Sequence, residues 1–307
     1  MRIVVTGAGG FLGKAVLPLL GNYEVVSTDR RLPTEIDGVE GDLCDPAFIR
    51  DLIGPGCDAV IHLASMPGAA VAADPARGWA VNLDGLRLLA DAAARAGNRP
   101  RFVYASSIAV LGDLRPDQPV DDETALLPCS HYGALKVMGE TWLAMLHRQN
   151  VLSAVSLRLP GLVARPPGGS GFGSAFLSEM FWAIADGRRL ELPVSREGVS
   201  WLMSASSAAT NIVHALTVQD RDLPPSRAVT LPVVRVTMAD LIAAVAQHCG
   251  REPYLTHVPV AAIQRSFASY PPLRAAAAEA AGFRADSSLN ALVAAAMEQG
   301  GAWQARG

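Results

Sequence analysis

The sequence places a tyrosine and a lysine four positions apart, Tyr132 and Lys136, at the start of a segment with helical periodicity. This spacing puts both side chains on one helix face, one turn apart. A phenol with a pKa near 10 is a weak base at neutral pH. A neighbouring ammonium stabilises the phenolate and lowers that pKa. We therefore expect Tyr132 to take a proton from a substrate hydroxyl, with Lys136 as the supporting cation.

Two serines end an earlier strand-like run, residues 102–106, and offer a hydrogen-bond donor for the same reaction. An alternating strand end can present either Ser106 or Ser107. We favour Ser107 as the residue that holds the substrate oxygen beside Tyr132. His131 is the alternative base, but the sequence places no acidic partner for it. The predicted catalytic residues are therefore Ser107, Tyr132 and Lys136.

A glycine-rich turn, Gly7 to Gly13 with Gly10 between them, follows the first strand-like run and precedes a helical pattern. Here the first glycine makes the tight bend, the second lets a diphosphate approach the backbone, and the third permits close helix–strand packing. The helix N-terminus presents N–H groups and a positive dipole end to the phosphates. Strand before and helix after are the context that such a loop requires. We expect this turn, including Phe11 and Leu12, to bind a dinucleotide.

An acidic residue ends the second strand-like run. Asp29 lies 22 positions after Gly7, close to the roughly 20 expected for an acid that binds the adenosine ribose. Its carboxylate would repel a 2′-phosphate, which favours NAD over NADP. Arg30 and Arg31 either accept such a phosphate or form a solvated turn. NAD is the predicted cofactor.

Two further loops are expected along the cofactor. Asp42, with Leu43, is expected near the adenine amino group. Leu63, Ala64 and Ser65 end the strand-like run 59–63, where small residues leave room for the cofactor to pass.

The segments that carry these residues alternate between strand and helix character. Short apolar runs rich in β-branched or aromatic residues occupy 3–6, 24–28, 59–63, 102–106 and 154–159. Helical periodicity occupies 11–20, 47–53, 79–96 and 132–148. Repeated strand–helix–strand order implies a parallel sheet with helices on both faces. The predicted fold is α/β, with a Rossmann-type doubly wound parallel sheet.

The pattern changes after Pro160. Residues 165–173 are rich in glycine and proline and are predicted to form a loop. Helical patterns follow at 175–186, 204–218, 238–249 and 288–299, with short strands near 228–231 and 254–258, while 266–287 has no clear assignment. We predict an NAD-binding domain over 1–160, its core shared with later segments, and a smaller substrate-binding lobe over 161–307. The lobe should cover the carboxyl ends of the strands.

Composition excludes several classes of protein. A net charge of -3 over 307 residues gives no basic field for nucleic acid. No apolar run approaches the roughly 20 residues that span a bilayer. The strand at the N-terminus leaves no room for a signal peptide, so we expect a cytoplasmic protein without a membrane partner. The four cysteines show neither metal-ligand nor disulfide spacing, and no metal is predicted.

Taken in order, these motifs resemble the extended short-chain dehydrogenase/reductase family, of the NAD-dependent epimerase/dehydratase type. The matching residues, all within 1–165, are Thr6, Gly7, Gly10, Gly13, Asp42, Leu43, His62, Leu63, Ala64, Asn82, Leu83, Gly85, Ser106, Ser107, Val110, Gly112, Tyr132, Lys136 and Arg158. The resemblance implies a serine–tyrosine–lysine site and cofactor contacts that include Asn82 and Pro160. It also implies a homodimer through helices that include 132–148. There Met138, Trp142 and Met145 suit either that contact or the core.

Within the family, residues 1–215 are most similar to D-erythronate dehydrogenases and related sugar-acid oxidoreductases. The residues that carry this similarity are Pro67, Gly68, Ala69, Ala70, Asp74, Pro75, Arg158, Leu159, Pro160, Arg165, Pro166, Ser170, Gly171, Phe172, Ser174 and Trp201. The resemblance implies NAD-dependent oxidation of a secondary hydroxyl of a small sugar acid to a keto acid.

An acid substrate needs a cation in its binding site. Arg165 can bind a carboxylate at two points, or it is a surface residue of a proline-rich loop. Ser65, Ser107 and Tyr132 are expected to contact the substrate. Ser174 and Trp201 are expected to line its site, although a core position explains Trp201 somewhat better.

Two other functions use the same fold. A nucleotide-sugar epimerase or dehydratase holds NAD tightly and returns the hydride to its substrate. The C-terminal region has few basic residues for a nucleotide diphosphate, and Ile108 and Ala109 stand where dehydration favours an acid. A non-catalytic NAD-binding protein is the second alternative. The presence of both Tyr132 and Lys136 disfavours it.

Overall fold

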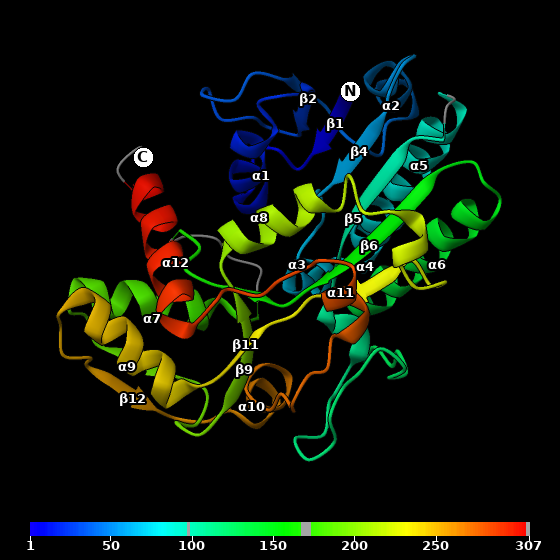
Figure 1. Cartoon of the computed structure of the whole chain (residues 1–307). Helices are drawn as coiled ribbons and strands as arrows, with labels where there is room; N and C mark the ends of the chain where they lie inside the picture. The colour runs from blue at the N-terminus through cyan, green and yellow to red at the C-terminus, as the bar shows by residue number, and fades with distance from the viewer. Residues whose placement is uncertain (97–98, 167–172, 305–307) are drawn as a thin grey trace.

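Seven parallel strands form the central sheet of the computed structural model, which describes residues 1–96, 99–166 and 173–304 (Figure 1). The strands, in spatial order, are β10 (Ala228–Thr230), β6 (Ser153–Leu159), β5 (Arg101–Ser107), β4 (Ala59–His62), β1 (Arg2–Thr6), β2 (Glu24–Asp29) and β3 (Val39–Glu40). The chain moves outward from β1 to β3 and then returns to β4 on the other side. The strand order therefore reverses between β1 and β4, where ligands of such sheets bind. The predicted Rossmann-type fold is confirmed.

Helices cover both faces of this sheet. One face carries α1 (Phe11–Val16), continued by the 3₁₀ turn η1 (Leu17–Leu20), and α8 (Ala205–His214). The other face carries α2 (Pro46–Ile53), α5 (Gly85–Arg95) and α6 (His131–Arg148) (Figure 1). Burial from both sides explains why β1 reads as an uninterrupted apolar run. Before α5 the chain forms α3 (Gly68–Ala73), α4 (Pro75–Trp79) and the π-helical turn η2 (Ala80–Asp84).

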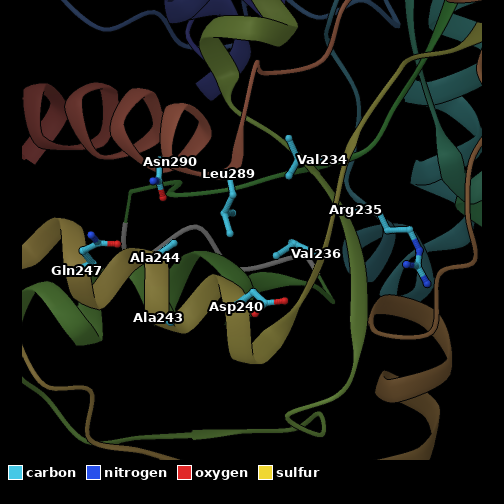
Figure 2. A pocket seen from close by; sticks show the side chains of 9 residues that line it. All are labelled: Val234, Arg235, Val236, Asp240, Ala243, Ala244, Gln247, Leu289 and Asn290. Atoms are coloured by element: carbon cyan, nitrogen blue, oxygen red, sulfur yellow. The ribbon is translucent and has the colours of Figure 1, made fainter.

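A second apolar core lies in the C-terminal lobe. Its helices are α7 (Ala175–Asp186), α9 (Met238–Cys249) and α12 (Leu289–Gln304). Its strands are β7 (Gly161–Leu162), β8 (Leu190–Leu192), β9 (Val199–Met203), β11 (Val234–Thr237) and β12 (Leu255–His257). These strands form two small sheets, in the orders β11-β9-β7 and β12-β8. A pocket of about 410 Å³ opens between β11, α9 and the start of α12 (Figure 2).

Two segments that follow residue 160 pack with the central sheet rather than with the core of the lobe. Helix α8 buries Ala205, Ala208 and Ile212 in the same core as β1, and β10 pairs with β6. Their short apolar patterns fit either core, so the sequence alone did not assign them. The unassigned stretch 266–287 contains the end of α10 (Ala261–Phe267) and α11 (Ala276–Ala280).

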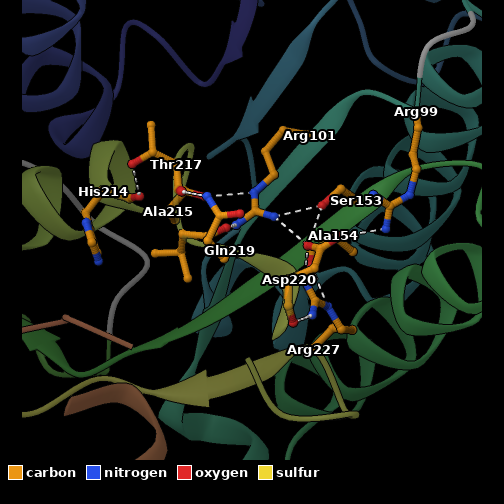
Figure 3. Close-up of polar contacts among 11 residues, drawn as sticks. Arg99, Arg101, Ser153, Ala154, His214, Ala215, Thr217, Gln219, Asp220 and Arg227 are labelled. Carbon is orange, nitrogen blue, oxygen red and sulfur yellow. Dashed lines mark hydrogen bonds and ion pairs between the residues drawn. The ribbon is translucent and has the colours of Figure 1, made fainter. Parts of the chain in front are cut away.

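An ionic cluster joins the amino ends of β5 and β6 to the 3₁₀ turn η4 (Asp220–Asp222), shown in Figure 3. The carboxylate of Asp220 accepts hydrogen bonds from Arg99 at 2.6 Å, Arg101 at 2.9 Å, Ser153 at 2.7 Å and Arg227 at 2.6 Å. Burial would raise the pKa of Asp220. Hydrogen bonds from Ser153 and Arg99, with the charges of Arg227 and Arg99, outweigh burial and hold the pKa far below its usual value.

No helix in the described parts of the chain is both long and apolar enough to cross a membrane. The four cysteines, Cys44, Cys57, Cys129 and Cys249, are free thiols.

Candidate active site

Tyr132 lies in the first turn of α6, where the carboxyl ends of β4 and β5 meet this helix. Ser130 caps the helix, because its hydroxyl accepts a hydrogen bond from Gly133 N at 3.1 Å. The half-buried Tyr132 shares side-chain hydrogen bonds with Ser107 and Ser65. Ser107 is the last residue of β5, and Ser65 follows β4. The structure thus brings together three residues that the sequence assigned to the substrate.

The two adjacent serines of β5 have different partners. Ser106 is buried and donates a hydrogen bond to Glu140 Oε1 at 2.5 Å, while Ser107 meets Tyr132. The two side chains thus reach different turns of α6. Ser107 is therefore the serine that can reach a substrate oxygen beside Tyr132.

Lys136 is buried one turn further along α6. Its ammonium group donates a hydrogen bond to Ala105 O at 2.7 Å and lies 5.5 Å from the centroid of the Tyr132 ring. Burial lowers the pKa of Lys136 to about 7, although the nearby charge of Glu140 opposes this change.

The pKa of Tyr132 is raised in the structure. Burial is the largest cause, opposed by the Ser107 hydrogen bond, the charge of Arg165 and the Ser65 hydrogen bond. Arg165 is the cation that favours the Tyr132 phenolate.

Arg165 follows β7 and faces the site. Burial lowers the pKa of its guanidinium to about 10, and the interaction with Tyr132 opposes that change. The guanidinium carbon lies 5.8 Å from the centroid of the Phe11 ring, at the start of α1. The backbone oxygen of Arg165 accepts a hydrogen bond from Trp182 at 2.6 Å. These contacts place Arg165 between the glycine-rich turn and Tyr132, rather than on an exposed loop.

The glycine-rich turn has the close contacts that only glycine permits. Gly7 has a φ of +72°, and a Cβ atom there would lie 2.6 Å from Ala64 N. A Cβ atom at Gly13 would lie 2.4 Å from Gly7 O, whereas one at Gly10 would meet only Gly7 O, at 3.2 Å. Helix α1 begins at Phe11, so its first N–H groups face the turn. This open backbone at a helix N-terminus fits a dinucleotide diphosphate.

Asp29 lies beside this turn, at the end of β2. One carboxylate oxygen accepts a hydrogen bond from Gly9 N at 3.1 Å, and the other accepts one from Arg30 N at 2.7 Å. The side chain is therefore held where β2 ends, next to the turn. Arg30 and Arg31 are exposed.

Two predicted cofactor residues have partners that the sequence did not reveal. Asp42 accepts a hydrogen bond from Arg77 of α4 at 2.6 Å and one from Cys44 N at 2.9 Å, and the Cys44 bond is the largest cause of its lowered pKa. Asn82 is buried in η2, and its amide bonds both Met66 N and Met66 O, at 2.7 and 3.0 Å. Asn82 thus holds the loop that carries Ser65, and both ends of its amide are occupied.

Trp201 does not line a substrate site, contrary to one of the two expectations. It has no exposed surface, donates a hydrogen bond to Pro271 O at 2.8 Å and stacks on Tyr270. It belongs to an apolar core under η3 (Ile108–Leu111). Because β9 packs against this core, Trp201 is a core residue and not part of the lining of a substrate site.

The remaining predicted residues have less specific surroundings. Leu43 is a core residue, Leu63 and Ala64 follow β4, and Pro160 is buried between β6 and β7. Ser174 is half-buried directly before α7. Ser170, Gly171 and Phe172 lie outside the described residues. The pocket in Figure 2 contains none of the predicted site residues.

His62 is a neighbour of the site to which the sequence assigned no role. Its Nδ1 atom lies 2.7 Å from the Thr6 hydroxyl, and its ring stacks on Tyr104. Burial, together with the charge of Lys136, lowers the pKa of His62 to about 3, so the ring is neutral. The sequence feature that could have identified His62 as a neighbour of the site is its position at the end of β4, beside Leu63.

Comparison with known proteins places this chain in one family. The chain belongs to the NAD dependent epimerase/dehydratase family, whose sequence profile matches residues 3–227. It is an NAD-dependent dehydrogenase of the short-chain dehydrogenase/reductase type, as the motifs predicted.

Relatives and solved structures match nearly the whole chain. The D-erythronate dehydrogenase of Cupriavidus necator is 32% identical over 98% of this chain and 99% of its own length. The D-erythronate dehydrogenase of Haemophilus influenzae is 28% identical over 95% of this chain and 98% of its own. A crystal structure of a nucleoside-diphosphate-sugar epimerase from Agrobacterium tumefaciens gives a TM-score of 0.86, with 26% identity over 97% of this chain and 94% of that one.

Proposed function

We propose that this enzyme oxidises a secondary hydroxyl of a small sugar acid to the corresponding keto acid, with D-erythronate as the first candidate substrate. The observation that carries the proposal is the position of Arg165, whose guanidinium carbon lies 5.8 Å from the centroid of the Phe11 ring and whose charge favours the Tyr132 phenolate. A substrate carboxylate bound by this guanidinium would bring a nearby hydroxyl within reach of the phenol. The two D-erythronate dehydrogenases that match this chain support the same substrate class.

In this mechanism Tyr132 removes the proton from the substrate hydroxyl as a carbonyl forms on the same carbon. Ser107 donates a hydrogen bond to the reacting oxygen and holds it beside Tyr132. NAD supplies the acceptor for the hydride that leaves the carbon. Arg165 binds the carboxylate and favours the phenolate, and Lys136 contributes positive charge in its ammonium form. Ser65 and Ser174 complete the proposed substrate contacts.

The proposed cofactor contacts come from the sheet edge on both sides of the β1–β4 reversal. Gly7, Gly10 and Gly13, with Phe11 and Leu12, hold the diphosphate, and Asp29 binds the adenosine ribose. Further contacts are proposed from Arg30, Asp42, Leu43, Leu63, Ala64, Ser65, Asn82, Tyr132, Lys136 and Pro160.

We also propose a cytoplasmic homodimer formed through α6 and its neighbours. Met138 of α6 and Trp79 of α4 are large apolar side chains that remain exposed in the single chain, and burial in a dimer would remove them from water. Light scattering of the purified protein should give twice the chain mass, and a Met138→Glu variant should shift it toward the monomer.

Absorbance at 340 nm tests the proposed reaction. Purified protein is mixed with NAD, or with NADP in parallel, and a panel containing D-erythronate, L-threonate, aldonates and uronates. We expect NADH formation with a four-carbon acid. Arg165→Met should raise KM for the acid far more than KM for NAD, and Tyr132→Phe should abolish turnover without weakening acid binding. No NADH formation with any acid, together with NAD retained through purification, would favour an epimerase or dehydratase.

A further inference from the structure

Three consecutive residues at the end of β5 each contact a side chain of α6. The contacting pairs are Ala105 with Lys136, Ser106 with Glu140, and Ser107 with Tyr132. Tyr132, Lys136 and Glu140 are four residues apart, so they occupy successive turns of one helix face. Glu140 is therefore next in the row that holds two of the proposed catalytic residues.

Glu140 is buried and fixed by two strands. Besides the Ser106 hydroxyl, its carboxylate accepts hydrogen bonds from Arg158 of β6, from Nε at 3.0 Å and from Nη2 at 2.8 Å. Only 4% of Glu140 and 8% of Arg158 are exposed. The carboxylate thus has a fixed position, paired with Arg158, one helical turn from Lys136.

Lys136 depends on this carboxylate, because the other groups around it carry no negative charge at neutral pH. The titratable and charged groups that face it are His62 of β4, Tyr104 of β5, and Tyr132 and Glu140 of α6, with Arg158 behind Glu140. Burial keeps His62 neutral and raises the pKa of Tyr104. Among these groups, Glu140 alone is an anion.

We propose that Glu140 is a positioning residue of the active site, whose carboxylate favours the ammonium form of Lys136. The inference rests on the role proposed for Lys136 in the dehydrogenase reaction. It gives Glu140 an electrostatic task in addition to its ion pair with Arg158. Lys136 acts in turn on Tyr132 and the bound substrate.

The amino-acid composition allows a direct test, because the chain contains two lysines, Lys14 and Lys136. Protein labelled with [¹³C]lysine should give two ε-carbon NMR resonances, and a Lys14→Arg variant assigns them. The Lys136 resonance should titrate near pH 7 in the natural protein. In Glu140→Gln its midpoint should fall by at least one pH unit, a tenfold loss of proton affinity. The Lys14 midpoint is the internal control and should not change.

An unchanged Lys136 midpoint in a folded Glu140→Gln protein would overturn the proposal. If that variant does not fold, a Glu140→Gln, Arg158→Gln double variant removes the ion pair as a unit. A purely structural ion pair predicts that this double variant keeps the natural Lys136 midpoint, whereas our proposal predicts the lowered one.

The NMR titration needs no substrate, so it separates this inference from the proposed reaction. A lowered midpoint in a protein that oxidises no acid supports the role of Glu140 and refutes the substrate. Turnover of D-erythronate with an unchanged Lys136 midpoint supports the proposed substrate and refutes the role of Glu140. Where turnover is found, the pH profile of kcat in Glu140→Gln should shift in the same direction as the lysine midpoint.

Discussion

Replacing Asp220 with asparagine should destabilise the protein strongly, although it lies far along the sheet from Tyr132. Asparagine keeps the shape of the side chain but removes the charge shared by Arg101 and Arg227, whose side chains are 10% and 3% exposed. Breaking a buried pair costs about 3–5 kcal/mol. Because Asp220 itself is 31% exposed and partly screened by solvent, we expect a loss of about 3 kcal/mol.

The corresponding change in melting temperature follows from the size of the protein. An unfolding entropy of about 2.1 cal/mol/K per residue gives about 0.6 kcal/mol/K for the whole chain, so Asp220→Asn should lower Tm by about 5 °C. Circular dichroism at pH 7 measures this. Asp222→Asn is the matched control, because its side chain in the same turn is 48% exposed. The control should change the free energy of unfolding by less than about 0.5 kcal/mol.

The pH dependence provides a second check. The folded state lowers the pKa of Asp220, so its contribution is complete above the unfolded pKa near 3.9 and is lost as the pH falls below that value. The difference in stability between the natural protein and Asp220→Asn should therefore narrow by about 1.4 kcal/mol per pH unit below pH 4. A Tm change under about 1 °C, or a difference that is equal at pH 7 and pH 3, would refute the reasoning.

Three shorter predictions test other parts of the structure. Gly13→Ala should prevent folding or abolish NAD binding, because the new Cβ atom would lie 2.4 Å from a backbone oxygen. Gly21→Ala is the control: its Cβ atom would have nothing within 4 Å, so both Tm and the Kd for NAD should stay unchanged. Trp201→Phe should reduce the free energy of unfolding by about 1–3 kcal/mol, because a buried carbonyl loses its donor; a raised substrate KM with unchanged stability would contradict the core position. The lowered pKa of His62 means that its contribution to stability is complete above pH 6.5 and is lost as the pH falls toward 3. The free energy of unfolding in urea should therefore change less between pH 7 and pH 5 in His62→Asn than in the natural protein.

The elements with strong local signals could be predicted from the sequence. Helices α7 and α9 have the predicted bounds because each ends at a glycine with positive φ, Gly187 and Gly250. Strands β7 and β9 were missed, because they pair with each other across about forty residues and neither pattern alone is distinctive. The reassigned α8 and β10 show the same limit: an apolar stripe specifies burial but not which core receives it.

Some features of the candidate site could likewise be predicted from the sequence, and others could not. The four-residue spacing of Tyr132 and Lys136 is a local property of a helix, so it was visible in the sequence. The electrostatic effect of Arg165 on Tyr132 joins residues 33 positions apart. The ion pair of Asp42 with Arg77 joins residues 35 positions apart. The pKa of a side chain also depends on residues far away in the sequence. Burial raised the pKa of Tyr132, whereas its neighbours in sequence suggested a lowered pKa.

The return of the chain to the central sheet limits how this enzyme can be re-engineered. A chimera that joins residues 1–160 to the C-terminal part of a relative would replace the edge strand β10 and the helix α8 of the central sheet together with the lobe. A viable chimera would have to exchange the lobe segments separately and keep 205–231 from the parent protein. Substrate range in this scaffold should therefore be altered by replacement of the proposed substrate residues Arg165 and Ser174 and their neighbours rather than by exchange of a whole domain.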